Sequence, residues 1–528
     1  MQSDKQWLSH INPELFLFYR STYLITLEAW RRGLKVTFFD VYKYIISSDT
    51  DNLLFISSRA LPEPESDPNE ITRNKSISKE YLKKNNIPIP ESRSFSNNDD
   101  ILALLNYGKL LGFPVVIKPT FGTKGKGVKV NILDENSLEK EILYLRNNLG
   151  INDILIEKYI IGEDYRLQVV GSDVVGAIKR IPANVSGNGV DTIYKLIYTK
   201  NNIRKQNPFL KKDLITIDNE VSKYVQEAGF SLEYVPKKDE FIYLRGKENA
   251  PLYLSSGGDS IDVTDLISDD LKSVAVRAAQ SIPNLYVAGL DIIVERSKGT
   301  DNPVVIEINS TPQLGLHVFP SEGNARDIPS AIIDYFFPES CQSKSENRNL
   351  YYNYKSIEQS LKDGVVREVS LKRPPSGKIM VRQILIPKAL QCAWLEKWVK
   401  KKALKLRLNG YLKNLKSGTV LIVVYGNEKD IDIFLNSCLK KLKESTAQNV
   451  KIFEWKKHVM AGFYNKGHIV LDQELRHARQ QVKTKNKELK KVRAKYKKIK
   501  QSRAWQYTKT LKQLKKFLKH IIQFNKLI

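Results

Sequence analysis

The apolar positions of the first seventy residues change from a helical to a strand-like period. Residues 15–32 place apolar side chains at steps of three and four, which predicts an amphipathic helix. After Gly33, residues 35–40 and 53–56 are short apolar runs typical of strands. Pro62, Pro64 and Pro68 then interrupt an acidic stretch, as in a linker. We therefore expect residues 1–70 to form a small α/β segment.

Residues 71–339 alternate between the two patterns many times. Helical spacing recurs in 78–85, 135–149 and 266–282, and short apolar runs occupy 115–117, 154–160, 167–170, 174–179, 287–294 and 303–309. Gly171-Ser172-Asp173 stands between two of these runs and predicts a hairpin turn. Strands that alternate with helices are typical of an α/β domain, which we expect here.

The remaining chain contains three further patterns. Residues 340–377 are rich in Ser, Lys and Asn and predict a linker, whereas residues 378–470 follow a β-α-β-β-α-β order. Apolar side chains from Leu475 to Ile499 recur at alternating steps of three and four, as in a coiled coil of four heptads. Its flanks are almost all basic, so a solvated single helix remains an alternative. Residues 511–528 predict a basic amphipathic helix.

Charge and cysteine content narrow the class of protein. The formal net charge is +27, but residues 474–528 hold nineteen Lys and Arg against only Glu474 and Glu488, so most of the excess belongs to the tail. The three cysteines have no metal-binding spacing, which favours a reducing cytosol over disulfides. No signal peptide is evident, and no run approaches eighteen apolar residues. We expect a cytoplasmic protein.

A glycine- and lysine-rich segment follows one of the apolar runs. Residues 115–117 predict a buried strand that ends at Lys118, and the next loop contains Gly122, Gly125 and Gly127 with two lysines between them. Glycines allow backbone N–H groups to approach a polyphosphate closely, and a lysine adds a positive charge. A surface hairpin would have a similar composition, so the loop alone does not decide between the two.

Three oxygen-bearing side chains lie on two later strands. Glu307 and Asn309 are two residues apart and therefore face the same side of a strand, and Asp291 lies on the preceding strand. Two carboxylates and an amide oxygen suit Mg²⁺ bound to nucleotide phosphates. The alternative is a strand-edge charge and a turn residue. We favour metal binding, because inward carboxylates among apolar neighbours are costly without a partner.

The glycine loop, the three oxygen-bearing side chains and several further segments together resemble the ATP-grasp carboxylate–amine ligases. The likeness covers residues 71–338 and is strongest to the glutathione synthetase part of bacterial bifunctional glutathione enzymes and to cyanophycin synthetase. It rests on segments 74–79, 116–119, 156–166, 180–193, 243–245 and 255–265, together with Asp291 and 307–309. The resemblance implies an ATP-grasp fold, with residues 1–70 preceding it.

The resemblance also implies a set of site residues. Lys75 and Lys118 would hold nucleotide phosphates beneath the loop of Gly122, Gly125 and Gly127. The adenine hinge would consist of Glu157, Lys158 and Ile160, and Asp164 would bind the ribose. The metal ligands for Mg²⁺ or Mn²⁺ would be Asp291, Glu307 and Asn309. The substrate carboxylate and transferred phosphate would lie among Arg166, Arg180 and Arg245.

The activity that the resemblance implies is ATP-dependent amide formation through an acyl phosphate. Cations and metal would neutralise the transferring phosphoryl group, and no nucleophilic side chain is needed. The substrates would be a carboxylate and an amine on an amino acid, a peptide or a cell-surface polymer, and which of these applies stays open. The alternatives are a non-catalytic ATP-binding scaffold and an acyl-phosphate hydrolase.

The β-α-β-β-α-β segment resembles acylphosphatase, a ferredoxin-like fold. Asn414 falls on the catalytic asparagine of that family, but residues 387–396 contain neither the glycines nor the arginine of its anion loop. We therefore expect a degenerate, non-catalytic domain at 378–470, with hydrolysis as the alternative. For the tail, 472–528, we expect contact with an anionic membrane or acidic polymer and self-association through the coiled coil. No base-reading motif accompanies the charge, which disfavours nucleic acid.

Overall fold

The computed structural model describes residues 20–122, 125–246, 257–297, 300–343, 347–387, 393–442 and 449–466. The predicted coiled coil and basic helix of residues 472–528 lie outside the described residues, as do the first five residues of the predicted N-terminal helix. The described chain divides into two compact units. The first runs to Ile379 and includes Lys456–Ala461, and the second contains Met380–Trp455 and continues from Gly462. None of the described helices combines the length and apolar character that crossing a membrane requires.

A small sheet with strand order β17-β1-β2-β3-β4 begins the first unit. Its strands are Lys35–Phe38 (β1), Lys43–Ser47 (β2), Asn52–Ile56 (β3), Arg59–Leu61 (β4) and Val369–Ser370 (β17). Helix α1 (Arg20–Arg31) packs against α10 (Ile328–Phe336), where Arg32 Nη1 lies 2.6 Å from Asp334 Oδ1. The predicted strands at 35–40 and 53–56 are thus present, and the start and end of the unit meet in space.

Residues 340–377, predicted as a linker, instead contain regular secondary structure, and one of their strands joins this small sheet. They contain η5 (Pro338–Ser343), β16 (Leu350–Tyr351) and α11 (Tyr354–Lys362), and their strand β17 pairs antiparallel with β1. Tyr352 and Tyr354 are buried, and their rings contact Tyr23. The linker prediction was wrong because two buried tyrosines anchor a segment whose other residues are mostly polar.

A second sheet, β5-β8-β6-β7, holds the glycine-rich segment. It consists of Ser92–Phe95 (β5), Val115–Pro119 (β6), Lys129–Ile132 (β7) and Ile154–Lys158 (β8). Helices α4 (Ile101–Leu111) and α5 (Glu135–Leu143), the latter continued by η2 (Tyr144–Asn148), pack with it in one apolar core. Asp134 begins α5 by accepting a hydrogen bond from the backbone N–H of Ser137.

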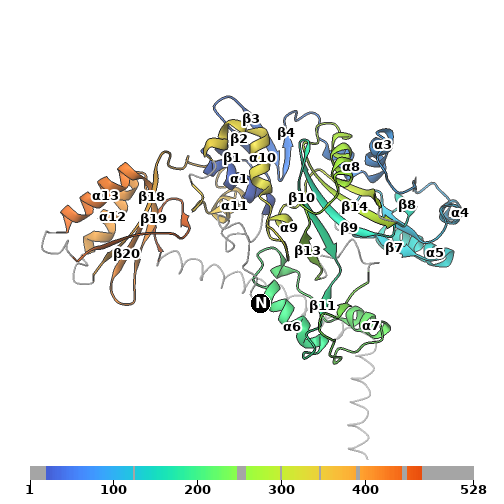
Figure 1. Ribbon diagram of the computed structural model, residues 1–528. Helices are drawn as coiled ribbons and strands as arrows, with labels where there is room; N and C mark the ends of the chain where they lie inside the picture. The colour runs from blue at the N-terminus through green and yellow to red at the C-terminus, as the bar shows by residue number, and fades with distance from the viewer. Residues whose placement is uncertain are drawn as a thin grey trace, which may run out of the picture. The chain divides into compact units, whose positions relative to one another are not determined.

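The central sheet has the order β13-β10-β9-β14-β15, and Figure 1 shows α8 lying across it. Its strands are Glu163–Val170 (β9), Asp173–Ile181 (β10), Asp259–Asp262 (β13), Val287–Ser297 (β14) and Thr300–Asn309 (β15). Helices α3 (Lys75–Lys84), which follows the short α2 (Asn69–Arg73), and α8 (Asp269–Gln280) contribute to its core. Leu167, Leu290 and Ile308 face that core, so alternate residues of the same strands face the other way.

A subdomain between β10 and β13 was not predicted. It contains β11 (Asn184–Ser186), α6 (Ile193–Arg204), η3 (Leu210–Lys212), α7 (Asn219–Glu227) and β12 (Phe241–Tyr243), and it has its own apolar core. Asp259 at the start of β13 joins it to the central sheet, because its carboxylate lies 2.5 Å from Lys200 Nζ and 3.0 Å from Arg204 Nη1. The short helix α9 (Gly315–Val318) follows β15.

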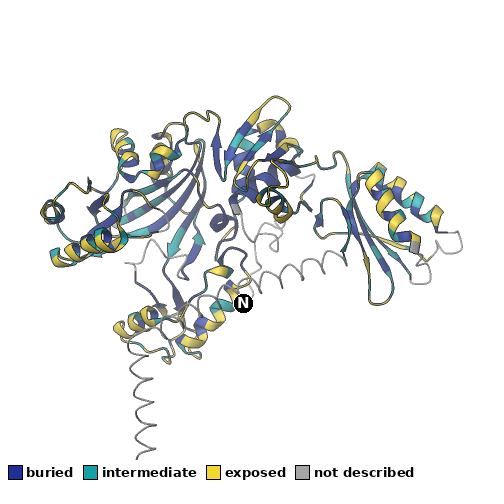
Figure 2. Ribbon diagram, turned by 180° about the vertical axis from the view of Figure 1, so that it is seen from behind, coloured by how far each residue is buried: buried dark blue, intermediate teal, exposed yellow. Residues whose placement is uncertain are grey.

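The second unit is a sheet of order β21-β18-β20-β19-β23 packed with two helices. Its elements are Ile379–Ile386 (β18), Ala393–Lys405 (α12), Asn409–Asn414 (β19), Val420–Asn427 (β20), Glu428–Lys441 (α13), Lys451–Glu454 (β21) and Phe463–Asn465 (β23). The predicted β-α-β-β-α-β order is confirmed, with β23 as an additional strand. Strand β22 (Val459–Met460) belongs to the first unit, where it pairs with β16. Figure 2 shows the exposed faces of both helices turned away from their sheet.

Candidate ATP-dependent ligase site

The polar face of the central sheet brings together six of the fifteen predicted site residues. On β14, Asp291 lies directly opposite Glu307 of β15 and Arg166 of β9. Arg180 of β10 lies opposite Asp164 of β9. Because side chains alternate along a strand, Asp164, Arg166, Asp291 and Glu307 all point away from the core under α8. The sheet register therefore assembles one site from four strands.

Ion pairs connect the charged groups of this face. Arg166 Nη1 lies 3.0 Å from Asp291 Oδ1, and Arg180 Nη1 lies 3.1 Å from the same oxygen. Arg180 Nη2 also lies 2.6 Å from Asp164 Oδ1. Burial would raise the pKa of Asp291, but the two guanidinium groups outweigh it and hold this pKa below its usual range. Burial raises the pKa of Asp164, and Arg180 offsets that only in part.

Asp291, Glu307 and Asn309 fit a divalent cation in type and position. Both arginine contacts of Asp291 fall on Oδ1, and the side chain of Glu307 is one-third exposed. Asn309 shares their face, since it lies opposite Gly289, two residues from Asp291. Within the described residues, no group of three or more His, Cys, Asp and Glu side chains is arranged to hold a metal. A metal here would therefore need the amide oxygen of Asn309 or oxygens from a bound phosphate.

The two predicted phosphate-binding lysines lie on neighbouring elements. Lys75 is the first residue of α3, which Asn74 caps, and its Nζ lies 3.1 Å from the Gly122 carbonyl oxygen and 3.6 Å from Glu307 Oε1. This one ammonium group therefore links the glycine loop to a predicted metal ligand. Lys118 lies on β6, and its Nζ donates a hydrogen bond of 2.6 Å to Glu157 Oε1 on β8.

The glycine-rich loop has the backbone that its composition predicts. Gly125 and Gly127 have φ of +68° and +74°, and the N–H of Val128 donates to the carbonyl of Gly125. A side chain at Gly127 would also crowd Pro119 and Leu145, at 3.0 and 3.1 Å from its Cβ. Residues 123 and 124 lie outside the described part of the chain.

The predicted hinge begins with the last two residues of β8, Glu157 and Lys158. Lys158 donates to the carbonyl oxygens of Leu111 and Gly112, at 3.0 and 2.6 Å, which ties the hinge to the end of α4. Ile160 is partly buried two residues further on. The Glu157 side chain is fully buried between two lysines, so within the described structure its carboxylate serves as their counter-ion.

Arg245 lies apart from the other two predicted arginines. It follows β12 in the inserted subdomain, where its guanidinium contacts Asp218 at 2.5 Å and also contacts Glu220. Among the described residues, no ion pair joins it to the central sheet. Segment 247–256, which follows it, is outside the described residues.

Several residues that support this site were not predicted. Lys79 is the second lysine on Glu157, and its position four residues after Lys75 on a helix is a signal that the sequence did contain. Gly289 leaves room for the Arg166 guanidinium, because a Cβ there would lie 2.4 Å from Arg166 Nη2. His317 is fully buried against Gly176 and neither ring nitrogen has a partner. No sequence signal pointed to Gly289 or His317.

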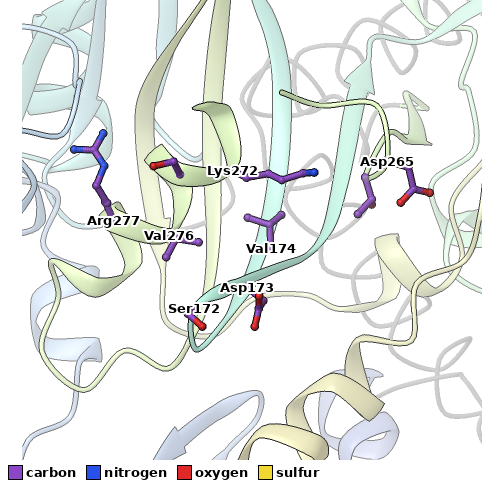
Figure 3. Close-up of a pocket in the computed structure, with 9 residues that line it drawn as sticks. Ser172, Asp173, Val174, Asp265, Lys272, Val276 and Arg277 are labelled. Atoms are coloured by element: carbon purple, nitrogen blue, oxygen red, sulfur yellow. The ribbon is translucent and has the colours of Figure 1, made fainter. Parts of the chain in front are cut away.

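A hollow of about 450 Å³ lies elsewhere on the first unit. It is formed by the β9–β10 turn, the loop after β13 and α8, the helix that covers the apolar face of the sheet. Figure 3 shows Lys272 extending toward Asp265, while Arg277 points to the other side. None of the predicted site residues lines this hollow, so it is separate from the charged face.

In the second unit, Asn414 is held by a carboxylate. Its side-chain amide donates to Glu396 Oε1 at 2.9 Å, and Asn465 donates to Glu396 Oε2 at 3.1 Å. An acidic group beside an asparagine disfavours the binding of an anion at that position.

Comparison with known families identifies both domains. Residues 72–189 match the RimK-like ATP-grasp domain, and residues 393–464 match acylphosphatase. The chain therefore contains an ATP-grasp domain followed by an acylphosphatase-type domain, as predicted from the sequence. The coiled-coil tail stays a prediction.

Named relatives resemble the first part of the chain. The glutathione biosynthesis bifunctional protein GshAB of Clostridium perfringens is 32% identical over 329 residues, which cover 60% of this chain and 41% of the relative. A cyanophycin synthetase of Trichormus variabilis is 33% identical over 274 residues, which cover 51% and 29%. The chain thus spans less than half the length of these relatives.

Among solved structures, a bifunctional glutathione synthetase from Pasteurella multocida is similar. It is 24% identical with a TM-score of 0.42, and the match covers 56% of this chain and 41% of that one.

Proposed function

We propose that this protein is an ATP-dependent carboxylate–amine ligase. The observation that carries the proposal is the single polar face on which Asp291 lies opposite both Glu307 and Arg166, with Arg180 on the same carboxylate. Lys118 lies on β6, the strand before the glycine loop, and Lys75 contacts that loop at the Gly122 carbonyl. The ATP-grasp family match and the name of one relative, cyanophycin synthetase, support the same class.

The charge distribution suits phosphoryl transfer followed by amide formation. The substrate carboxylate would attack the γ-phosphorus of ATP, ADP would leave, and an amine would then displace phosphate from the acyl phosphate. Lys75 and Lys118 would hold the phosphates, and Arg166 and Arg180 would neutralise charge on the transferring group. Asp291, Glu307 and Asn309 would hold Mg²⁺ or Mn²⁺, which would supply positive charge to the phosphates.

We assign the remaining predicted residues to binding. The loop of Gly122, Gly125 and Gly127 would cover the phosphates. The backbone of Glu157, Lys158 and Ile160 would contact adenine. Asp164 would release Arg180 and bind the ribose hydroxyls instead. Arg245, from the inserted subdomain, would meet the substrate carboxylate.

The proposal is tested by amine-dependent ADP release from purified protein with ATP and Mg²⁺. The substrate panel contains amino acids and γ-glutamyl peptides, and the control is the double variant Asp291→Ala/Glu307→Ala. We expect turnover with at least one pair and none in the control. Tight ATP binding without turnover of any panel member would indicate a polymeric substrate. Failure to bind ATP would refute the ligase function and favour a ligase-like scaffold that works without ATP.

For the tail we propose a docking role. The excess of lysine and arginine after residue 474 supports contact with an anionic membrane or an acidic polymer, in a cytoplasmic protein recruited to the inner face of the membrane. The heptad pattern supports self-association. Light scattering of the full chain, and co-sedimentation with anionic and neutral vesicles, test these two roles separately.

A further inference from the structure

Three charged side chains meet behind the predicted phosphate site. Glu157 is 2% exposed, and its two oxygens contact different lysines: Oε1 lies 2.6 Å from Lys118 Nζ and Oε2 lies 3.0 Å from Lys79 Nζ. Lys79 and Lys118 are 7% and 4% exposed. The three residues come from α3, β6 and β8, so they form a buried cluster with one net positive charge.

The two lysines are not equivalent partners of Glu157. Lys118 makes a short hydrogen bond of 2.6 Å to one oxygen, whereas Lys79 forms an ion pair of 3.0 Å with the other. Burial would raise the pKa of Glu157, but the charges of Lys118 and Lys79 outweigh it and hold this pKa below its usual range. Glu157 therefore stays ionised and needs a cation at all times.

When Lys118 binds a phosphate, its ammonium group contacts two anions, the phosphate and the Glu157 carboxylate. If Lys118 were the sole partner of Glu157, each contact it made with a nucleotide phosphate would weaken the neutralisation of a buried carboxylate. A second cation removes this conflict. Lys79 is suited to that role because it lies on the same face of α3 as Lys75, one helical turn further on.

We infer that Lys79 is a positioning residue for ATP binding, which neutralises Glu157 so that Lys118 is available to the nucleotide phosphates. The inference rests on the proposed function, since it assigns Lys118 to the nucleotide. Lys79 acts through Glu157 and does not touch the ligand itself. Lys75, by contrast, lies at the Gly122 carbonyl and Glu307.

The test is the binding of a fluorescent ATP analogue, with Mg²⁺, to the full chain and its variants. Lys79→Met should weaken binding about tenfold, the value of one charge-assisted hydrogen bond. Lys79→Arg should restore affinity to within about threefold, because it keeps the charge. Lys84→Met is the matched control: it removes the same charge from an exposed position of the same helix and should leave affinity unchanged.

The decisive measurement repeats the substitution without the carboxylate. In Glu157→Gln, Lys118 no longer has an anion to neutralise, so adding Lys79→Met should change affinity less than about twofold. An equal loss in both backgrounds would mean that Lys79 acts on the nucleotide directly, and no loss in either would mean that it has no role in binding. Both results overturn the inference.

Two further controls separate the remaining outcomes. Thermal unfolding of each variant identifies loss of the fold, and Lys79→Gln replaces Lys79→Met where the methionine variant does not fold. Where turnover is measurable, Lys79→Met should raise KM for ATP and leave kcat nearly unchanged, which a general loss of stability would not do. If the unaltered protein does not bind the analogue, the proposed function fails; if it binds and Lys79→Met binds equally well, the inference alone fails.

Discussion

Substituting Gly289 by alanine would place a methyl group against the Arg166 guanidinium. The new Cβ would lie 2.4 Å from Arg166 Nη2 and 2.7 Å from Cβ of Pro312. Non-bonded heavy atoms need about 3.5 Å, so the guanidinium would have to move by about 1 Å. Since its Nη1 lies 3.0 Å from Asp291 Oδ1, a movement of this size disrupts their ion pair.

The magnitude follows from that displacement. A catalytic group misplaced by about 1 Å costs about 100-fold in rate, which corresponds to about 2.7 kcal/mol of transition-state stabilisation. Crowding of the strand should also lower the free energy of unfolding by about 1–3 kcal/mol. ATP affinity should change little, because Lys75 and Lys118 lie on α3 and β6 and not on β14.

The assay is ADP release with the substrate pair that the wild type uses, together with ATP-analogue binding and thermal unfolding. We expect kcat/KM to fall about 100-fold while the dissociation constant for ATP stays within about twofold. In an Arg166→Ala background, Gly289→Ala should cost less than about threefold more, since the group that it displaces is absent. Wild-type kcat/KM in Gly289→Ala, or an equal loss in both backgrounds, would refute this account of the site.

Three further results are expected. Burial, with a smaller contribution from Arg166 and Arg326, lowers the pKa of His317 from 6.5 to about 3. Between these two pH values the histidine is protonated in the unfolded chain but neutral in the folded chain. Stability is therefore lost as pH falls below about 6.5, by about 2 kcal/mol at pH 5, and the histidine NMR signal that disappears in His317→Asn should not titrate near pH 6.5. Asp259→Asn should lower stability by about 3 kcal/mol, because Lys200 and Arg204 lose their carboxylate, whereas Lys223→Gln at a largely exposed ion pair should not shift the midpoint of thermal unfolding. The full chain should hydrolyse benzoyl phosphate no faster than buffer, with Asn414→Ala unchanged; a rate that depended on Asn414 would show that the second unit is a hydrolase.

The local sequence pattern was sufficient to predict those helices and strands that depend mainly on their own residues. The short apolar runs predicted β9, β10, β14 and β15, and the order of elements predicted the second unit. Glu307 and Asn309 could be placed on one face because side-chain alternation in a strand is a local property. Burial of the linker segment was missed because Tyr352 and Tyr354 pack against α1, more than three hundred residues earlier.

The sequence by itself determined which chemical groups are present and on which elements they lie: lysines beside a glycine loop, carboxylates on paired strands, and arginines near them. Only the tertiary structure decided which of these groups meet. Register across three strands joins Asp291 to Arg166 and Arg180, and the packing of α3 brings Lys79 to Glu157. The physical reason is that ion pairing and burial depend on distances between segments far apart in the chain, which a one-dimensional pattern does not contain.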